Sequence, residues 1–180
     1  MHGVPSNLRD LLRRWSLLAT RCIAMALGDI VIRFCNASFG AIEAVRRSLG
    51  RPGVETISTA ALRDALNSSQ TPPVLVDVRS DAERAVSRIP GAITQQEFEA
   101  SSDEKFSGRR VVTYCTVGGR SYLYACKLAA RGIEATNYRD SILGWCRAGL
   151  PLESPDGEAT DAVHPYWRIF HVPDRYDVKT

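Results

Sequence analysis

The sequence predicts an α/β domain built around a largely parallel sheet, and two observations carry this prediction. From about residue 54 onward, short apolar runs alternate with helical stretches, which is the pattern of strands joined by helices. The runs at 73–78 and 111–114 are apolar almost throughout, which indicates strands buried on both faces. The 180 residues, 44% of them apolar, suit one domain with an extension rather than two domains.

Residues 1–51 precede this pattern and predict a basic, helical extension. Apolar residues recur at steps of three and four between residues 7 and 26, which predicts an amphipathic helix with arginines on its other side. Gly28 and Asp29 indicate a break, after which a second helix is expected from residue 30 to 47, ending at Gly50. The extension has eight Arg, no Lys and three acidic residues, and residues 52–180 carry a net charge of −2.

Three roles for the extension remain open: a helical layer packed on the domain, a peripheral contact with an anionic membrane or a partner, and an organelle-targeting presequence. We therefore expect the chain in the cytoplasm or in the interior of an organelle, a mitochondrion or a plastid. The uncharged stretches before residue 50 fall far short of the roughly 18 apolar residues of a membrane span. Nucleic acid is not expected as a partner, because the domain is slightly acidic and lacks interleaved basic and aromatic residues.

Within the domain, Gly, Pro and cap residues divide the chain into short elements. Ser58 or Thr59 caps the first helix, and Gly132 and Gly149 end the last two. In chain order we expect a strand at 54–57, a helix to about residue 66, strands at 73–78 and 111–114, a helix at 122–130, a strand at 133–138 and a helix at 142–148.

The stretch after residue 114 carries the chemistry, because a cysteine, a glycine-rich loop and an arginine precede a helix there. Gly118 and Gly119 can adopt positive φ at no steric cost, so the backbone N–H groups of residues 116–121 can turn inward around the sulfur of Cys115. The helix N-terminus adds partial positive charge. Cys115 is thus expected to ionise more readily than a free cysteine and to act as a nucleophile toward an anionic substrate.

The other four cysteines, Cys22, Cys35, Cys126 and Cys146, lack such a setting and are expected to pack. Their irregular spacing disfavours a disulfide framework or a zinc knuckle. No P-loop or zinc spacing is present, so neither a metal nor a cofactor is expected.

Several motifs, taken in their order along the chain, resemble those of the rhodanese-like domains. The first half of the resemblance is Val-Leu-Val-Asp-Val-Arg at 74–79, Asp-Ala-Glu-Arg at 81–84 and Arg-Ile-Pro-Gly-Ala at 88–92. The second half is the cysteine loop at 112–121, then Ser-Ile-Leu-Gly-Trp at 141–145 and Gly-Leu-Pro-Leu at 149–152. The resemblance covers residues 54–153 and implies a three-layer domain with a central parallel sheet, flanked by the helical extension at 1–51 and an aromatic tail at 154–180.

Loop length separates the chemistries that this resemblance implies. Four residues lie between Cys115 and Arg120, as in sulfurtransferase rhodaneses, whereas the related cell-cycle dual-specificity phosphatases and arsenate reductases have five. A smaller ring of amides suits a persulfide sulfur better than a tetrahedral oxyanion. Sulfur transfer is therefore favoured, with a phosphatase, an arsenate reductase or a non-catalytic sulfur-carrier or binding module as alternatives.

The implied reaction moves sulfane sulfur from a small anionic donor such as thiosulfate to a thiol or cyanide through a Cys115 persulfide. Arg120 would orient the donor, and the substrate-binding residues would be Thr116, Val117, Gly118, Gly119 and Ser121, whose hydroxyl can donate to the sulfur. Thr116 and Val117 replace positively charged residues of efficient thiosulfate enzymes, and Arg88 replaces a histidine that the family often has.

Two further groups of residues have a structural and a functional interpretation. Asp77 and Arg79, with Glu83 nearby, read either as a catalytic acid and cation or, as we favour, as a structural ion pair. In the tail at 154–180, His164 or His171 would approach Cys115 as a base, or the aromatic residues would form a groove for a partner. We favour a tail that covers an apolar edge of the domain.

Overall fold

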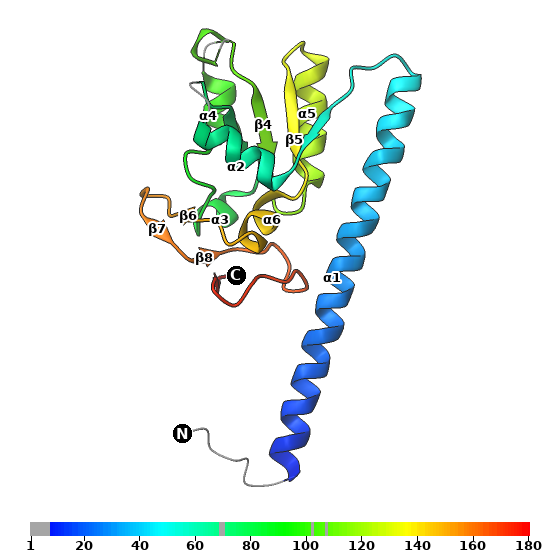
Figure 1. The fold of residues 1–180 in the computed structure, drawn as a ribbon, viewed down its shortest axis with the longest axis vertical. Helices are drawn as coiled ribbons and strands as arrows, with labels where there is room; N and C mark the ends of the chain where they lie inside the picture. Colours follow the sequence, from blue (N-terminus) through cyan, green and yellow to red (C-terminus); the bar gives the residue numbers. More distant parts are fainter. Residues whose placement is uncertain (1–7, 69–70, 102, 107) are drawn as a thin grey trace.

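A five-stranded, entirely parallel sheet organises the computed structural model, which describes residues 8–68, 71–101, 103–106 and 108–180 (Figure 1). The strands are β1 (Glu55–Ile57), β2 (Val74–Asp77), β3 (Ile93–Thr94), β4 (Val111–Tyr114) and β5 (Ala135–Tyr138), in the spatial order β1-β5-β4-β2-β3. Each neighbouring pair is parallel. All residues of β2, β4 and β5 are buried, as their apolar runs predict.

Helices cover both faces of the sheet and confirm the three-layer prediction. One core cluster joins the sheet to α2 (Thr59–Ser68) and α6 (Ser141–Arg147), through side chains such as Leu62 and Ile142. The other cluster joins it to α5 (Gly119–Ala130), through Ala125 and Leu128, with Phe98 of α4 (Gln95–Ala100) at its edge.

Three short elements were not expected from the sequence: β3, α4 and α3 (Asp81–Arg84). Both helices begin with a capping box, formed by Ser80 with Glu83 and by Thr94 with Glu97. The 3-10 turn η1 (Asp103–Phe106) follows α4. These elements are too short to show a hydrophobic period, so the caps of α3 and α4 are the local signal that the sequence carries for the two helices.

The N-terminal segment forms one helix, α1 (Leu8–Ser48), and the expected break at Gly28 and Asp29 is wrong. A β-carbon at position 28 would lie 2.2 Å from the carbonyl oxygen of Ile169. Gly28 therefore permits close approach of the C-terminal tail to the helix and does not end it. The side chains of Leu8, Leu12 and residues 17–26, together with Cys35, lie outside the described residues, so the amphipathic face predicted there and the packing of Cys22 and Cys35 stay predictions.

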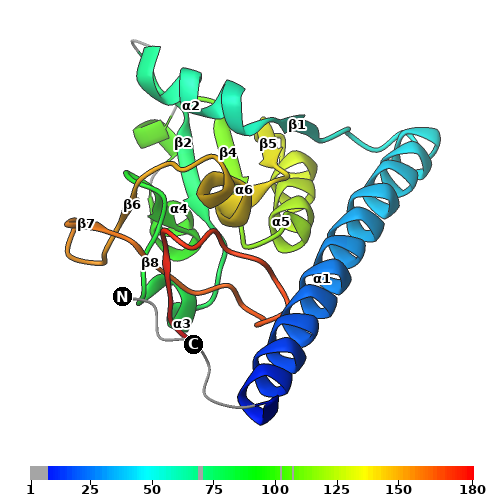
Figure 2. The same cartoon turned by 60° about the horizontal axis from the view of Figure 1, so that its bottom comes forward.

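A buried carboxylate anchors α1 to the domain, where the helix runs beside α5 (Figure 2). Glu43, 8% exposed, accepts hydrogen bonds from the hydroxyl of Tyr122 at 2.7 Å and from the N–H of Val54 at 3.0 Å. The ring of Phe39 packs on Tyr122, with 5.0 Å between the ring centroids. Part of α1 is thus a packed layer, whereas its targeting and membrane roles stay predictions.

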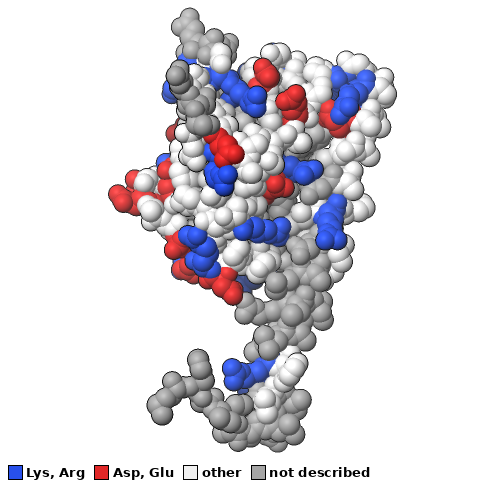
Figure 3. Space-filling view, viewed as in Figure 1, with Lys and Arg blue, Asp and Glu red and all other residues white. Residues whose placement is uncertain are grey.

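Large apolar side chains remain exposed on the part of α1 that the structure describes, and on Leu49 directly after it: Leu11, Trp15, Leu27, Ile30, Phe34, Ile42 and Val45. Among the described residues, no helix is both long enough and apolar enough to cross a membrane. On the domain face drawn in Figure 3, basic and acidic side chains are interspersed.

The segment after α6 returns across the carboxyl end of the sheet. β6 (Leu152–Glu153) pairs with β7 (Ala159–Thr160), and β8 (Ala162–Val163) pairs with β9 (Asp177–Val178). The tail buries Val163, Phe170, Val172 and Tyr176 in the core cluster on the α6 side. It therefore contributes to the hydrophobic core of the domain.

Replacement of Glu43 tests the anchor of α1. Glu43→Ala leaves the hydroxyl of Tyr122 and the N–H of Val54 without their acceptor, which costs about 1–3 kcal/mol of unfolding free energy. Urea denaturation measures this loss of stability. Hydrogen exchange measures the release of the helix, and we expect faster exchange along α1. Phe34→Ala on the exposed side of the same helix is the control, and equal exchange in both variants would contradict the anchor.

Candidate active site

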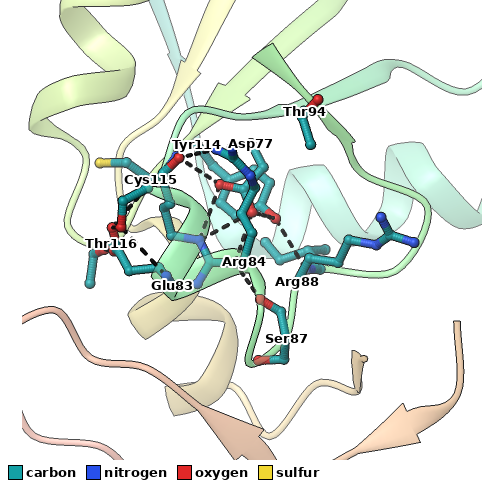
Figure 4. Close-up of polar contacts among 12 residues, drawn as sticks. Asp77, Glu83, Arg84, Ser87, Arg88, Thr94, Tyr114, Cys115 and Thr116 are labelled. Carbon is teal, nitrogen blue, oxygen red and sulfur yellow. Dashed lines mark hydrogen bonds and ion pairs between the residues drawn. The ribbon is translucent and has the colours of Figure 1, made fainter. Parts of the chain in front are cut away.

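Cys115 lies directly after β4, at the carboxyl end of the sheet, with its side chain pointing into the loop before α5 (Figure 4). It is 1% exposed. Its Sγ accepts a hydrogen bond from the N–H of Gly118 at 3.1 Å and from the hydroxyls of Ser121 at 3.6 Å and Ser141 at 3.9 Å. These donors and the N-terminus of α5 all face the sulfur.

Of the two loop glycines, only Gly118 has the left-handed backbone that the sequence predicts for both. Gly118 has φ of 92°, and a β-carbon there would lie 2.2 Å from the carbonyl oxygen of Arg139. Gly119 does not take a positive φ, because it already begins α5, and it lies against Phe39 of α1. Only Gly118 supplies a backbone hydrogen bond to Sγ among the described residues, so the expected ring of amides from 116–121 is reduced to one donor.

Two serine hydroxyls lie near the sulfur, and each has a nearer acceptor as well; for Ser141 this is the carbonyl of Tyr138 at 2.8 Å. Ser121, predicted as a donor to the sulfur, lies in the first turn of α5 because that helix begins three residues earlier than expected. Its hydroxyl is also 2.7 Å from Oδ1 of Asn137, so its one proton is shared between acceptors. The sequence analysis did not assign Ser141 to the site, although it lies in the family-like stretch at 141–145. It has φ of 53° and its hydroxyl accepts the N–H of Cys115 at 3.1 Å.

Arg120 is paired with a carboxylate inside the protein. Its Nη1 and Nη2 donate to Oε2 and Oε1 of Glu83 at 2.7 and 2.8 Å, and Nη2 also donates to the hydroxyl of Thr116 at 2.9 Å. Burial opposes the charge of Arg120, but Glu83 outweighs it and raises the pKa of the guanidinium. The side chain of Arg120 is 36% exposed and that of Glu83 is 1% exposed. Arg120 is thus the solvent-facing half of a buried pair.

Glu83 has more partners than Arg120, and the sequence analysis missed its position in the site. Its carboxylate accepts from the N–H and hydroxyl of Ser80 at 3.0 and 2.8 Å, and from the hydroxyl of Thr116. Burial opposes ionisation, but the hydrogen bonds from Arg120, Thr116 and Ser80 outweigh it and lower the pKa of Glu83 to about 2. The Ser-x-x-Glu spacing at 80–83, which is typical of a capping box, is the sequence pattern that could have identified Glu83.

Asp77 and Arg79 form the buried ion pair that the sequence analysis favours, with 2.8 Å between Nη2 and Oδ2. Tyr114 donates to Asp77 at 2.6 Å and accepts the N–H of Ile89 at 3.1 Å, while Arg79 also donates to the carbonyl of Ser87 (Figure 4). Burial opposes the charge of Arg79, but Tyr114 and Asp77 outweigh it and raise its pKa. The two charged side chains are at most 1% exposed. Through their bonds to Tyr114 and Ser87 they join the end of β4 to the segment after α3.

Val117 is not brought together with Arg120. It packs half-buried against the core and lines a cavity of about 300 Å³ with residues that include Ile32 of α1 and Leu143 of α6. Arg88, at the position where the family often has histidine, pairs with Glu153 at 2.6 Å. His164 lies in a turn of the tail, where its Nδ1 accepts the N–H of Tyr166 at 3.0 Å.

The other described thiols differ from Cys115 in their surroundings. Burial raises the pKa of Cys146 to about 12 and also raises that of Cys126. Among the described residues, no cluster of three or more His, Cys, Asp or Glu side chains is arranged to hold a metal ion.

Two glycines with positive φ test the loop geometry. Gly132→Ala meets no atom within 4 Å and should cost about 1–2 kcal/mol for its left-handed backbone alone. Gly118→Ala meets the carbonyl of Arg139 as well, so it should cost at least about 3 kcal/mol and displace the N–H that contacts Sγ. Urea denaturation and the alkylation rate of Cys115 measure both effects. Equal costs for the two variants would contradict the close approach at Gly118.

The charge of Glu83 predicts a pH-dependent stability. Its pKa falls from an ordinary 4.5 to about 2, so it contributes roughly 3 kcal/mol above pH 4.5 that is lost as the pH falls toward 2. Glu83→Gln should therefore be less stable at pH 7, and the gap to the wild type should shrink by about 2 kcal/mol by pH 3. Urea denaturation at both pH values measures it, with exposed Glu158→Gln as the control. A gap that does not change with pH would rule out the lowered pKa.

Comparison with known proteins places this fold and this cysteine loop in a family. The chain is 37% identical over 87 residues to a sulfurtransferase of Allochromatium vinosum, covering 47% of this chain and 81% of that protein. It is similar to a rhodanese-like domain protein from Staphylococcus aureus, with 30% identity, a TM-score of 0.45 and coverage of 51% of this chain and 91% of the other. It also resembles a thiosulfate sulfurtransferase from Pseudomonas aeruginosa, with 23% identity, a TM-score of 0.49 and coverage of 58% and 20%.

The family itself is identified by a match along the sequence. The model of the rhodanese-like domain matches residues 58–148, which is about half of the chain and runs from the start of α2 to the end of α6. The motifs at 74–92 and 141–145 and the cysteine loop lie within this match, whereas Gly-Leu-Pro-Leu at 149–152 follows it. This chain therefore belongs to the rhodanese-like domain family.

Proposed function

We propose that this protein is a sulfurtransferase that carries sulfane sulfur on Cys115 as a persulfide. The observation that supports this most directly is the environment of Sγ, which accepts from the N–H of Gly118 and faces two hydroxyls, that of Ser121 in the first turn of α5 and that of Ser141 at the start of α6. Such donors stabilise a thiolate before attack and a persulfide anion after it.

The reaction has two displacement steps. The Cys115 thiolate attacks the outer sulfur of a donor such as thiosulfate. The donor's S–S bond breaks, its electron pair leaves with sulfite, and a Cys115 persulfide remains. The thiolate of an acceptor, or cyanide, then attacks the outer sulfur of this persulfide, and the electron pair of the cleaved bond returns to Cys115.

Arg120 serves this reaction as a positioning residue. Its two-pronged contact with Glu83 and its bond to Thr116 hold the first turn of α5 in register with the loop. The exposed part of its side chain lies at the rim of the site, with its charge matched by that of Glu83.

Phosphoryl transfer is the competing function, and one observation weighs against it. Glu83 is ionised at neutral pH, since its pKa is about 2, and it touches both Thr116 and Arg120 of the loop. A fixed carboxylate this close to the loop opposes a Cys115 phosphate ester, which keeps two negative charges in the loop, more strongly than a Cys115 persulfide, which keeps one. It also opposes thiosulfate, itself a dianion, as the donor. The loop also has four residues between Cys115 and Arg120, one fewer than in the related phosphatases, so it leaves less room for a phosphate group.

Persulfide mass spectrometry after incubation with thiosulfate tests the proposal. We expect a mass increase of one sulfur on Cys115, none in Cys115→Ser, and loss of turnover in that variant. Arg120→Ala should lower kcat/KM by about ten- to a hundredfold, the equivalent of a charged hydrogen bond. Mercaptopyruvate and glutathione persulfide should be tried as donors in parallel.

Cys126→Ser is the matched control, because Cys126 is a half-buried thiol on α5 that packs against the neighbouring core cluster and whose loss should leave turnover unchanged. A protein that forms no persulfide with any of the three donors would contradict the proposal. Hydrolysis of an aryl phosphate that depends on Cys115 would favour phosphoryl transfer in its place.

A further inference from the structure

An aromatic side chain from the C-terminal tail completes the rim of the site. The ring of Tyr166 stacks on the guanidinium of Arg120, with 4.7 Å from Cζ to the ring centroid. Tyr166 lies beyond the residues 58–148 that match the family, so this contact comes from a segment outside that match. Arg120 is held on one side by Glu83 and on its face by Tyr166.

The backbone of the tail is shaped to place this ring. Tyr166 has φ of 69°, an unusual value for a bulky residue that costs conformational energy. The turn is held by the bond from its N–H to Nδ1 of His164 at 3.0 Å and by the N–H of Trp167, which donates to the carbonyl of Pro165 at 2.9 Å. A strained residue that is fixed by its neighbours and points at a catalytic loop is the kind of outlier that accompanies a functional role.

Tyr166 is part of an aromatic row that is open to solvent at one end. Tyr166 is 45% exposed and Trp167 is 52% exposed, with 5.1 Å between their ring centroids. Trp167 stacks in turn on Phe170 at 5.9 Å, and Phe170 is buried in the core cluster. The exposed rings are therefore tied to the domain and stand next to Arg120 as a rigid apolar surface.

The charge distribution at the same rim is poor for a small dianion. The charge of Arg120 is neutralised by Glu83, and the hydroxyl of Thr116 is engaged by both. Val117, at another loop position where efficient thiosulfate enzymes have positive charge, faces the core. What the rim offers to a substrate is aromatic surface.

We propose that Tyr166 and Trp167 are specificity residues that bind the organic group of the thiol acceptor, so that the site favours aromatic thiols over small hydrophilic ones. This inference rests on the proposed function, because it concerns the second displacement. In that step the acceptor thiolate RS⁻ attacks the outer sulfur of the Cys115 persulfide, the bond to Cys115 breaks with its electron pair going to Cys115, and the hydropersulfide RSSH leaves. Stacking of R on the exposed rings lowers the barrier for aromatic R only.

Discharge of a preformed persulfide separates the two proposals. The full-length protein is first loaded with thiosulfate or, where that donor fails, with glutathione persulfide or mercaptopyruvate, and loading on Cys115 is verified by mass spectrometry. Benzyl mercaptan and 2-mercaptoethanol, thiols of similar acidity, then compete as acceptors. We expect the wild type to prefer benzyl mercaptan, and Tyr166→Leu combined with Trp167→Ala to reduce that preference by about two- to tenfold, the range of one aromatic contact.

Three further variants distinguish a direct contact from a loss of structure. Tyr166→Phe keeps the ring and should keep the preference, and Trp167→Ala alone should lower it with little change in the urea midpoint. Leu123→Ala removes an apolar side chain that is 63% exposed on α5 and should change neither. A preference that is unchanged in the double variant, with Cys115 fully loaded, overturns this inference alone. Failure to load Cys115 with thiosulfate, glutathione persulfide or mercaptopyruvate overturns the proposed function and this inference with it.

Discussion

The ionised carboxylate of Glu83 is the constraint on which the arrangement of the site depends. It caps α3 through Ser80, accepts from Thr116 in the cysteine loop and pairs with Arg120 in the first turn of α5. Two regions that are far apart in sequence, α3 and the cysteine loop with the start of α5, are thereby fixed by one buried charge. Because a buried charge is tolerated only with a full set of partners, either region leaves an uncompensated group behind when it moves.

The cysteine loop shows how a short sequence is forced into one shape. At Gly118 the backbone is left-handed and lies close to the carbonyl of Arg139. A side chain is therefore disfavoured there both by the backbone conformation and by this close approach. This turn aims the N–H of Gly118 at Sγ and starts α5 at once. The ion pair of Asp77 and Arg79, one strand away, keeps the neighbouring loop ordered and takes no part in the exposed rim.

The sequence was informative where a pattern is periodic or a motif is local. The apolar runs at 73–78 and 111–114 predicted the two buried central strands, and the spacing from Cys115 to Arg120 located the loop. Long-range partners leave no such mark. Glu83 with Arg120, Glu43 with Tyr122, and Tyr166 with Arg120 join residues whose separation along the chain carries no periodic signal. For the same reason Gly28 resembled a helix break, since its real neighbour, Ile169, lies at the other end of the sequence.

That contact at Gly28 also links the two segments that flank the family domain. The carbonyl of Ile169 fits against α1 only where the helix has no side chain, and Ile169 follows Tyr166 by three residues in the same tail. The residue at position 28 of the helix and the course of the tail therefore constrain each other. Tails of other lengths or shapes grafted onto this domain would release position 28 from its restriction, and a bulkier residue at 28 would demand a different tail. Divergence in the two flanking segments is accordingly expected to be correlated, although neither belongs to the part of the chain that matches the family.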